Sequence, residues 1–463
     1  MPRLLPSLPV LVLRVAGGLT SLAAASGAEA TAVDAKAVDA KAVDAKAAVT
    51  ARVDSEFASL EAIFHRLHAN PELSFQEVET AALVAKELRA AGFEVTEKVG
   101  NTGVVGVLRN GPGPTVLLRA DMDGLPVKER TGLPWESRAV VRDLSGREQP
   151  AMHACGHDLH VTGLIGAARV LAAERARWSG TLVCVAQPAE EIVAGARAML
   201  RDGLYTRFPR PDFALALHVS SSRKAGEIGY VDGTPYASVS SVDILVRGVG
   251  GHGSQPHTAK DPVLLAAQII TALQGIVSRE IRPGTPAVVT VGTIQGGTKR
   301  NIIPEEVRLE LTLRSFDQKV MGQMVAAIRR ICAGTAAAAG VPEDRLPVVT
   351  VSPESAPVTT NDSALVRRLA GVFRTWFGPE RVEAASPSTG AEDFSEYGRT
   401  QPPVPIFIWS VGAADPARYA AAARGGPPVP ANHSPEAVFV ADPTLRTSVA
   451  SLTAAVLDLA PRR

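Results

Sequence analysis

Histidine is concentrated in a few short polar segments of this 463-residue chain. The densest segment runs from Met152 to His160 and reads Met-His-Ala-Cys-Gly-His-Asp-Leu-His. Neutral imidazole is the commonest metal ligand in proteins, and it also transfers protons near neutral pH. Cys155 lies two residues before His157, which places a soft ligand beside a borderline one, as zinc-type sites prefer. This segment therefore predicts a metal site rather than a set of surface or core histidines.

A second group of polar residues supplies the carboxylates and further imidazoles that such a site would use: Asp121, Asp123, Glu190, Glu191, His218 and His433. One cysteine, three histidines and one or two glutamates at a crevice can hold two metal ions, which lower the pKa of a shared water and polarise a carbonyl. One carboxylate of the Glu190–Glu191 pair would bind metal while its neighbour stays free as a general base. The expected reaction is hydrolysis of an amide or an ester.

The motifs of two other hydrolase classes are missing from the chain. There is no G-x-S-x-G elbow and no H-E-x-x-H, which disfavours a serine hydrolase and a zincin. The tetrahedral oxyanion of amide hydrolysis needs a hydrogen-bond donor, and His252 in the glycine-rich segment 248–257 is a candidate. That segment does not fit a phosphate-binding loop, because its lysine and hydroxyl are misplaced.

Strand–helix alternation predicts an α/β fold that brings these residues together. Short β-rich runs cover residues 104–108, 115–118, 182–186, 213–217 and 405–411. Asp121 and Asp123, the Glu190–Glu191 pair and His218 each follow the end of such a run. Active sites form at the carboxyl edge of open parallel sheets, so residues scattered along the chain are expected to converge on one crevice.

Residues 238–340 show a different pattern and predict an inserted subdomain. Strands are expected over 240–246, 287–294 and 306–315, and helices over 262–277 and 320–334. This β-α-β-β-α order is typical of a ferredoxin-like α+β unit. The expected division is a catalytic domain in two parts, 51–236 and 346–463, around an inserted domain at 237–345.

The N-terminus resembles a secretory leader. A basic start and an apolar, small-residue stretch precede Ala28-Glu29-Ala30, which predicts a signal peptide over residues 1–30 and a periplasmic or secreted protein; without cleavage it would be cytoplasmic. The repeat Ala-Val-Asp-Ala-Lys then occurs three times between Ala32 and Lys46. Its period of five matches neither helix nor strand, so a low-complexity linker is expected at 31–50.

Charge and composition limit the kinds of molecule that the protein is expected to bind. The formal net charge is +1 and no long basic run occurs, which excludes nucleic acid as the main partner. No apolar stretch near the ~20 residues of a membrane span is expected after the leader. The three cysteines give no disulfide framework; Cys184 lies in an apolar run and is expected to be a buried thiol, and Cys332 lies in an alanine-rich helix pattern.

At this point the chain resembles the amidohydrolase branch of the co-catalytic metallopeptidases, which contains hippurate hydrolases, N-acyl-amino-acid amidohydrolases, auxin-conjugate hydrolases and some carboxypeptidases. The resemblance spans about residues 55 to 460. The motifs that carry it, in the family's order, are His65-Arg-x-His68-x-x-Pro71-Glu72-Leu73-Ser74-Phe75-x-Glu77, Arg119-Ala-Asp121-Met-Asp123-Gly-Leu-Pro126, Met152-His-Ala-Cys155-Gly-His157-Asp158, Gln187-Pro-Ala-Glu190-Glu191, Leu217-His218-Val219, Gly251-His252, Asn301-x-Ile-Pro304 and Asn432-His433-Ser434-Pro435.

The resemblance implies a two-metal site. Its ligands would be Cys155, His157, Glu191, His218 and His433, with Glu190 as general base and Asp123 as a supporting residue. The inserted domain would act as a lid and form a homodimer contact. His252 and Asn301 would meet the substrate, and Arg314 or the Asn301 loop would hold its α-carboxylate. The metals would be zinc or manganese, with cobalt or nickel as alternatives.

Three functions stay open at this stage. The first is hydrolysis of an N-acyl amino acid or an aryl-acyl conjugate. The second is a carboxypeptidase or dipeptidase with the same metals, and the third is a binding protein without catalysis. The segment Ile192-Val193-Ala194-Gly195 replaces the glycine-rich stretch that usually follows the second glutamate, which bears on substrate preference. No ligand role is expected for His65, His68, His153, His160 or His257.

Overall fold

The computed structural model describes residues 26–462, and the side chains of residues from 43 onward. The chain divides into two units, 1–48 and 49–463, and each is described by itself. The predicted signal peptide lies mostly outside the described residues. Helix α1 (Ser26–Ala69) runs through the Ala-Val-Asp-Ala-Lys repeat, so this segment is helical although its period of five does not match a helix. The repeat is rich in alanine and lysine and contains no glycine or proline, which favours a helical backbone whatever the period of its valines.

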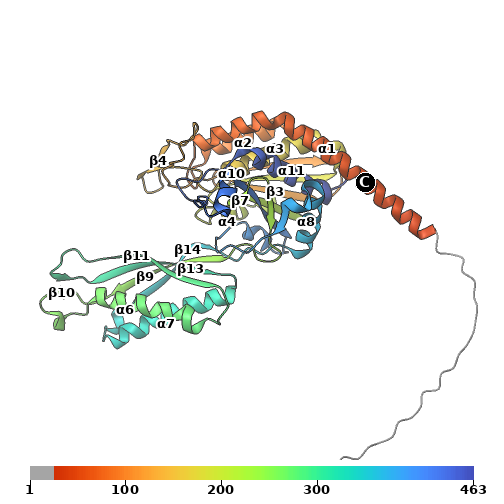
Figure 1. Cartoon of the computed structure of the whole chain (residues 1–463). Coiled ribbons are helices and arrows are strands. Elements are labelled where there is room, and N and C mark those ends of the chain that lie inside the picture. Colours follow the sequence, from red (N-terminus) through yellow and green to blue (C-terminus); the bar gives the residue numbers. More distant parts are fainter. Residues whose placement is uncertain (1–25, 463) are drawn as a thin grey trace, which may run out of the picture. The chain divides into compact units, whose positions relative to one another are not determined.

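The larger sheet has eight strands in the order β1-β2-β6-β3-β7-β16-β8-β15 (Figure 1). The strands are β1 (Glu94–Val99), β2 (Gly103–Asn110), β3 (Thr115–Asp121), β6 (Gly180–Gln187), β7 (Phe213–Lys224), β8 (Ile228–Tyr230), β15 (Val382–Ala384) and β16 (Ile406–Ala414). The central strands β6, β3, β7 and β16 pair in parallel, whereas β1–β2, β2–β6 and β16–β8 are antiparallel. The sheet is therefore mixed. Its central parallel strands have their carboxyl ends at one edge, and the predicted site residues lie at or just after these strand ends.

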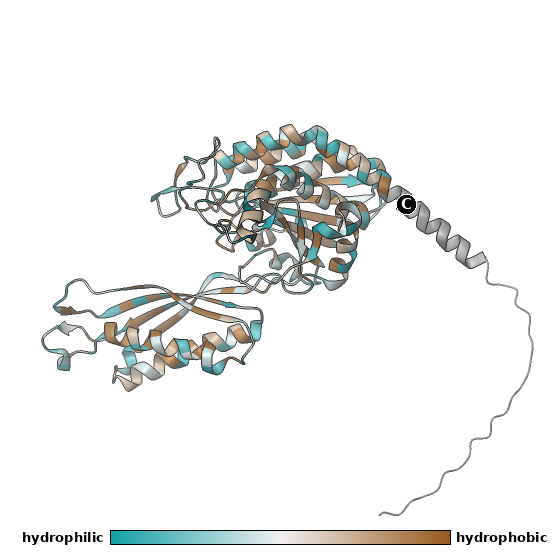
Figure 2. Ribbon diagram, viewed as in Figure 1, coloured by the Kyte–Doolittle hydropathy of each residue, from teal (hydrophilic) through white to brown (hydrophobic). Residues whose placement is uncertain are grey.

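Helices cover both faces of this sheet. Leu117 of β3 packs in one apolar cluster with Met199 and Tyr397, while its neighbours Val116 and Leu118 are also fully buried. Strands buried on both faces are typical of such sheets, and Figure 2 shows hydrophobic residues along the central strands. The covering helices are α2 (Val78–Ala90), α3 (His157–Ala173), α4 (Gly195–Arg201), α5 (Leu204–Arg207), α8 (Ser363–Phe377), α9 (Ser395–Gly398), α10 (Pro416–Ala423) and α11 (Ala441–Leu459).

The inserted subdomain has its own antiparallel sheet, in the order β11-β13-β9-β14, and two helices. Its elements are β9 (Ser238–Arg247), α6 (Pro262–Gly275), β11 (Ala287–Gly296), β13 (Glu306–Ser315), α7 (Gln318–Ala338) and β14 (Val348–Ala356). Alternate residues of β13 are buried, including Leu309, Leu311 and Leu313, and they pack with residues of α6 and α7. The β-α-β-β-α order agrees with the prediction, but β14 pairs with β9, so this sheet ends later than the expected boundary at 345.

One helical stretch in the described part of the chain, Pro262–Glu280, is long and apolar enough to cross a membrane by length and composition. This differs from the expectation that no such stretch follows the leader. One face of this helix, with Leu265, Ile269 and Leu273, is buried against the subdomain sheet, while Val263 and Leu264 are exposed.

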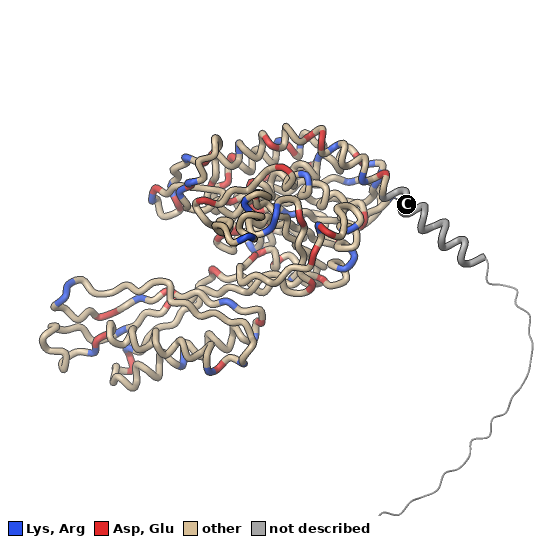
Figure 3. Tube along the Cα trace, in the orientation of Figure 1, with Lys and Arg blue, Asp and Glu red and all other residues tan. Residues whose placement is uncertain are grey.

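Charged residues of both signs are interspersed along the chain. Figure 3 shows lysine and arginine among aspartate and glutamate, without a long run of one sign. The formal net charge of +1 agrees with this even mixture of positive and negative residues.

Candidate active site

The predicted site residues meet at the carboxyl edge of the parallel strands. Asp121 ends β3, Glu190 and Glu191 follow β6, and His218 lies within β7. His157 begins α3, directly after Gly156, which has a φ of 84°. A Cβ on Gly156 would lie 2.3 Å from the Val219 side chain, so glycine allows the start of α3 to approach β7.

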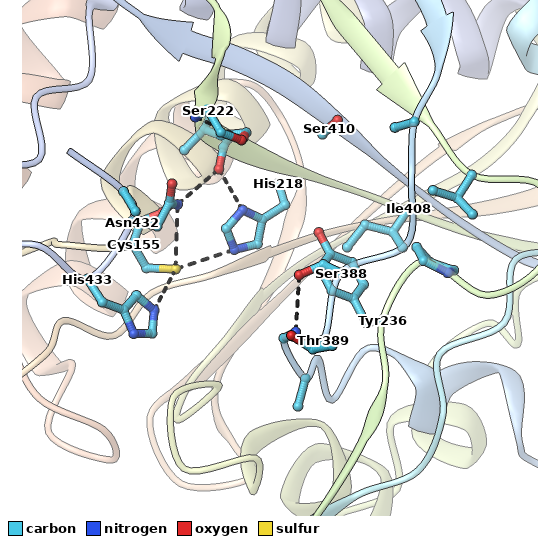
Figure 4. A pocket seen from close by; sticks show the side chains of 18 of the residues that line it. Cys155, His218, Ser222, Tyr236, Ser388, Thr389, Ile408, Ser410, Asn432 and His433 are labelled. Atoms are coloured by element: carbon cyan, nitrogen blue, oxygen red, sulfur yellow. Dashed lines mark hydrogen bonds between the residues drawn. The ribbon is translucent and has the colours of Figure 1, made fainter. Parts of the chain in front are cut away.

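The five predicted ligands form one cluster of nitrogen, sulfur and oxygen atoms. Cys155 Sγ lies 3.4 Å from His218 Nε2 and 3.2 Å from His433 Nε2 (Figure 4). Glu191 Oε1 lies 3.8 Å from His157 Nε2 and 3.6 Å from His433 Nε2. Three overlapping groups have ligand atoms within 4.8 Å of one another: Cys155, His157 and His218; Cys155, Glu191 and His433; His157, Glu190 and Glu191.

Two of the histidines, His157 and His218, are held so that Nε2, the ring nitrogen that would bind a metal, faces this cluster. His157 Nδ1 lies 2.8 Å from the carbonyl oxygen of Asp123, and His218 Nδ1 lies 2.7 Å from the carbonyl oxygen of Val219. A carbonyl only accepts, so Nδ1 carries the proton in each ring and Nε2 keeps its lone pair. Metal-binding histidines are commonly fixed in this way.

Asp123 holds the loop that carries the two glutamates. Its carboxylate accepts hydrogen bonds from the backbone N–H groups of Glu190 and Glu191, both at 3.0 Å, and from Ser74 Oγ at 2.6 Å. Glu77 accepts from the N–H of Ala189 at 2.8 Å. Asp123 thus supports the site through the backbone, as the resemblance implies, and its side chain is not among the clustered ligand atoms.

Burial and neighbouring charges perturb the acids of the site. Burial, followed by the nearby Glu392 and Glu191 carboxylates, raises the pKa of Glu190 well above its usual range. Burial, followed by Cys155, does the same to the pKa of Glu191. Burial alone would raise the pKa of Cys155, but His218 and His157 outweigh it and hold that pKa well below the usual range.

The cluster fits a metal site on its own geometry. His157 Nε2 and Glu191 Oε1 are buried side-chain atoms without a hydrogen-bond partner in the described chain. Buried polar atoms are normally paired, so two unpaired ligand atoms turned to one point indicate a missing cation. Thiolate, imidazole and carboxylate together suit zinc and other divalent transition metals. Cys155, His157, Glu191, His218 and His433 are the residues that would hold them.

A cavity of about 910 Å³ opens from this cluster. Its lining includes Cys155, Glu190 and His433 from the larger sheet's side, and Thr312 and Arg314 from β13 of the inserted subdomain. The predicted substrate contact Arg314 is therefore at the cavity.

His252 and Asn301 are not brought to this cavity. They lie in or next to a short antiparallel strand pair, β10 (Gly251–His252) and β12 (Ile302–Ile303), where the N–H of Gly253 donates to the Asn301 carbonyl. Both side chains are exposed and neither lines the cavity. Motif order alone could not show where this strand pair lies in the subdomain.

Several residues that were not predicted as ligands also support the site. Arg119 is buried and binds Asp121, Glu392 and Asp393, at 2.6, 2.8 and 3.1 Å. His160 donates to Asp121 and accepts from the Val219 N–H at 2.7 Å. Arg119 and Asp121 belong to the motif Arg119-Ala-Asp121-Met-Asp123. No sequence motif marks Glu392 or Asp393, which come close to Arg119 only in the folded chain.

A sequence profile of peptidase family M20/M25/M40 matches residues 117–423, the segment that contains most of this cluster. This chain belongs to the M20/M25/M40 peptidase family. It is a metal-dependent hydrolase of the amidohydrolase branch of that family, as the motifs indicated.

Similar M20 proteins cover most of the chain. A hippurate hydrolase from Campylobacter jejuni is 40% identical over 336 residues, which is 72% of this chain and 83% of that protein. Thermostable carboxypeptidase 2 from Saccharolobus solfataricus is 37% identical over 356 residues, or 75% of this chain and 84% of that protein. The YXEP protein of Bacillus subtilis, a dinuclear metal-binding M20 peptidase, matches in structure with a TM-score of 0.69 and 28% identity, covering 87% of this chain and 98% of its own.

Proposed function

We propose that this protein hydrolyses the amide bond of N-acyl amino acids, with two divalent metal ions at the clustered ligands and Glu190 as general base. The observation that carries the proposal is the convergence of five ligand residues with one further buried carboxylate at the inner end of a cavity. A hippurate hydrolase and the dinuclear YXEP protein are among the similar proteins, which supports both the substrate class and the number of ions.

Each residue has a defined task in this reaction. Two bound ions, zinc or manganese before cobalt or nickel, would activate a water and polarise the amide carbonyl. Glu190 takes the proton of the attacking water on its carboxylate and returns it to the leaving nitrogen. Its raised pKa brings this exchange closer to neutral pH, where a general base works best.

Arg314 is proposed to bind the α-carboxylate of the substrate. It is half-buried on β13, lines the cavity and has Glu354 nearby. A guanidinium binds a carboxylate through two parallel hydrogen bonds, which would fix the amino-acid half of the substrate.

His252 and Asn301 are proposed to reach the substrate from the inserted subdomain of a second copy, or by movement of their own subdomain as a lid. The edge strand β11 and helix α6 expose Ile294 and Leu264, at 54% and 60%, which supports a homodimer contact there. Light scattering of the purified protein measures its oligomeric state. If the protein is a monomer at all concentrations, only the lid movement could bring His252 and Asn301 to the substrate.

A carboxypeptidase or dipeptidase reaction at the same site is the second candidate, favoured by the similarity to the carboxypeptidase from Saccharolobus solfataricus. A non-catalytic binding protein is a remote third, because a binder has no use for a free base beside the ligands. The predicted leader also leads us to propose export to the periplasm or the medium, with no membrane or nucleic-acid partner for the exported protein.

Metal content and hydrolysis measured together test the main proposal. The protein from Thr31 onward is analysed for bound metal and assayed, with and without chelator, on N-acyl amino acids and dipeptides. About two equivalents of metal and chelator-sensitive amide cleavage are expected. The preferred substrate separates amidohydrolase from peptidase, and a protein that binds no metal would overturn the proposal.

A further inference from the structure

The loop that carries the ligand His433 is held by hydrogen bonds rather than by burial. No residue from Asp415 to Glu436 is buried, and the His433 side chain is 54% exposed. Helix α10, which lies in this segment, also has no buried residue. The His433 backbone has a φ of 71°, and its N–H donates to the Ala154 carbonyl at 2.7 Å. The position of the His433 ring therefore depends on polar contacts of the backbone around it.

The side chain of Asn432 lies among these contacts and joins three segments of the site (Figure 4). Its Oδ1 accepts from the Ser221 N–H at 3.0 Å and from Ser221 Oγ at 2.9 Å. Its Nδ2 donates to the carbonyl oxygens of Cys155 and Val219, at 3.1 and 3.2 Å. Asn432 thus connects its own loop with the Cys155 segment and with strand β7.

Every hydrogen-bonding position of this carboxamide has a partner. A carboxamide offers two N–H donors and two acceptor lone pairs. Here the donors meet two carbonyl oxygens, and the oxygen meets one N–H and one O–H. An aspartate at position 432 would keep the acceptors but lose both donors, and an alanine would lose all of these bonds. The partners therefore require an asparagine and fix the orientation of its amide.

The Val219 carbonyl connects Asn432 to a ligand ring. It accepts from Asn432 Nδ2 at 3.2 Å and from His218 Nδ1 at 2.7 Å. His218 Nε2 lies 3.4 Å from Cys155 Sγ, which lies 3.2 Å from His433 Nε2. Because Asn432 binds the backbone beside all three ligands, it fixes the separations of their ligand atoms.

We infer that Asn432 is a positioning residue of the metal site, and that it holds the ion to which His433 would contribute. This role rests on the metal binding proposed above. The group of ligand atoms that contains His433 also contains Cys155, whose carbonyl Asn432 binds. The group that His157 forms with the two glutamates has no hydrogen bond to Asn432 in the described chain. Loss of the carboxamide should therefore weaken one ion more than the other.

Metal affinity of the full-length protein tests this role without turnover. Metal-free wild type and Asn432→Ala are titrated with Co²⁺, and binding is followed by the d–d absorption of the ion and by the near-ultraviolet band of the thiolate–metal bond. The wild type is expected to bind two ions. In Asn432→Ala the affinity for one ion should fall about 10–100-fold, the usual effect of losing a residue that orients metal ligands, and that for the other should change by less than about threefold.

Asn110→Ala is the matched control. Asn110 is also half-buried and donates through Nδ2 to two carbonyl oxygens, those of Arg175 and Trp178, at 2.8 and 2.7 Å, but it lies outside the cavity. Its loss should lower the unfolding temperature and leave both Co²⁺ affinities unchanged. A purely structural Asn432 would behave in the same way, so wild-type affinities in Asn432→Ala overturn the inference.

Ser221→Ala is the second variant, in case Asn432→Ala does not fold. It removes one hydrogen bond of the carboxamide, and the affinity for the same ion should fall roughly three- to tenfold. An equal fall for both ions, or no fall, contradicts the positioning role. If the wild type binds two ions but cleaves no amide, the proposed hydrolysis fails and the affinities still decide the role of Asn432. A wild type that binds no ion overturns both.

Discussion

At the scale of single residues, the proposed mechanism gives different roles to two adjacent glutamates. Asp123 binds both backbone N–H groups, at 3.0 Å each, and this fixes the turn that separates the two side chains. Glu191 lies among the Cys155 and His433 ligand atoms, whereas Glu190 lies nearer the Glu392 and Asp393 carboxylates. This arrangement supports the proposal that Glu191 binds metal and Glu190 carries the proton.

Glu190→Gln tests this division. The amide cannot take a proton from water, so kcat is expected to fall by roughly 10²–10⁴-fold while metal content stays at the wild-type value. Metal analysis and steady-state kinetics are made on the same sample. Loss of metal would place Glu190 among the ligands, and an unaltered rate would contradict its role as base.

His68 gives the fold a pH-dependent contact next to the site. Its ring lies between Asp158 at 2.7 Å and Glu129 at 3.1 Å, and all three side chains are buried. Burial alone would lower the pKa of His68, but the hydrogen bonds to Asp158 and Glu129 raise it to about 10. The protonated ring thus joins α1, α3 and the segment after β3.

His68→Gln is expected to lower the free energy of unfolding by about 3 kcal/mol near pH 6. A raised folded-state pKa stabilises the fold in full below the unfolded value of about 6.5, and the effect is lost as pH rises toward 10. The difference between wild type and variant should therefore shrink between pH 7 and pH 10. Urea unfolding across this range measures it, and a difference that grows with pH would contradict the assignment.

At the scale of elements, Arg197 of α4 connects the glutamate loop to the inserted subdomain. Its Nη2 donates to the carbonyl of Val193 at 2.8 Å and to that of Pro353 on β14 at 3.1 Å. Val193 also packs with Val239 and Ala356, where the chain enters and leaves the subdomain. The residues that replace the usual glycine-rich stretch thus form a contact between the two parts.

Arg197→Met is expected to speed amide exchange in β14 by about tenfold, since a lost hydrogen bond to backbone costs about 1–1.5 kcal/mol. Arg201→Met, an exposed position on the same helix, serves as the control. Hydrogen exchange followed by mass spectrometry resolves the segment. Exchange that is equal in the two variants would show that Arg197 does not hold the subdomain.

The elements also show what the sequence could and could not predict. Strand ends and the Cys155–His157 motif predicted that Glu190, Glu191 and His218 converge on one crevice, because parallel strands bring their carboxyl ends to one edge. The full ligand set, His433 included, came from the resemblance to the family. Arg119 and Glu392 are 273 residues apart and meet only in the fold. The positions of His252 and Asn301 depend on the pairing of β10 with β12, two segments that are distant in sequence, which motif order does not encode.

At the scale of the whole molecule, the proposed metals would contribute to stability as well as to catalysis. Five ligand residues from four segments form one cluster, and without the ions His157 Nε2 and Glu191 Oε1 have no hydrogen-bond partner in the described chain. Removal of the metals by chelator is expected to lower the unfolding temperature by roughly 5–15 °C. Calorimetry before and after metal is restored tests this; equal unfolding temperatures would mean that the ligands hold no ion.

The unequal burial of the ligands bears on how fast each ion would exchange. Cys155 and His157 are buried, but the His433 side chain is 54% exposed and its backbone has a φ of 71°. An ion bound by His433 would therefore have the shorter path to solvent. His433 would also be the ligand that is released most easily. In a competition with a second metal, one equivalent should be replaced rapidly and the other slowly, giving mixed-metal protein on the way.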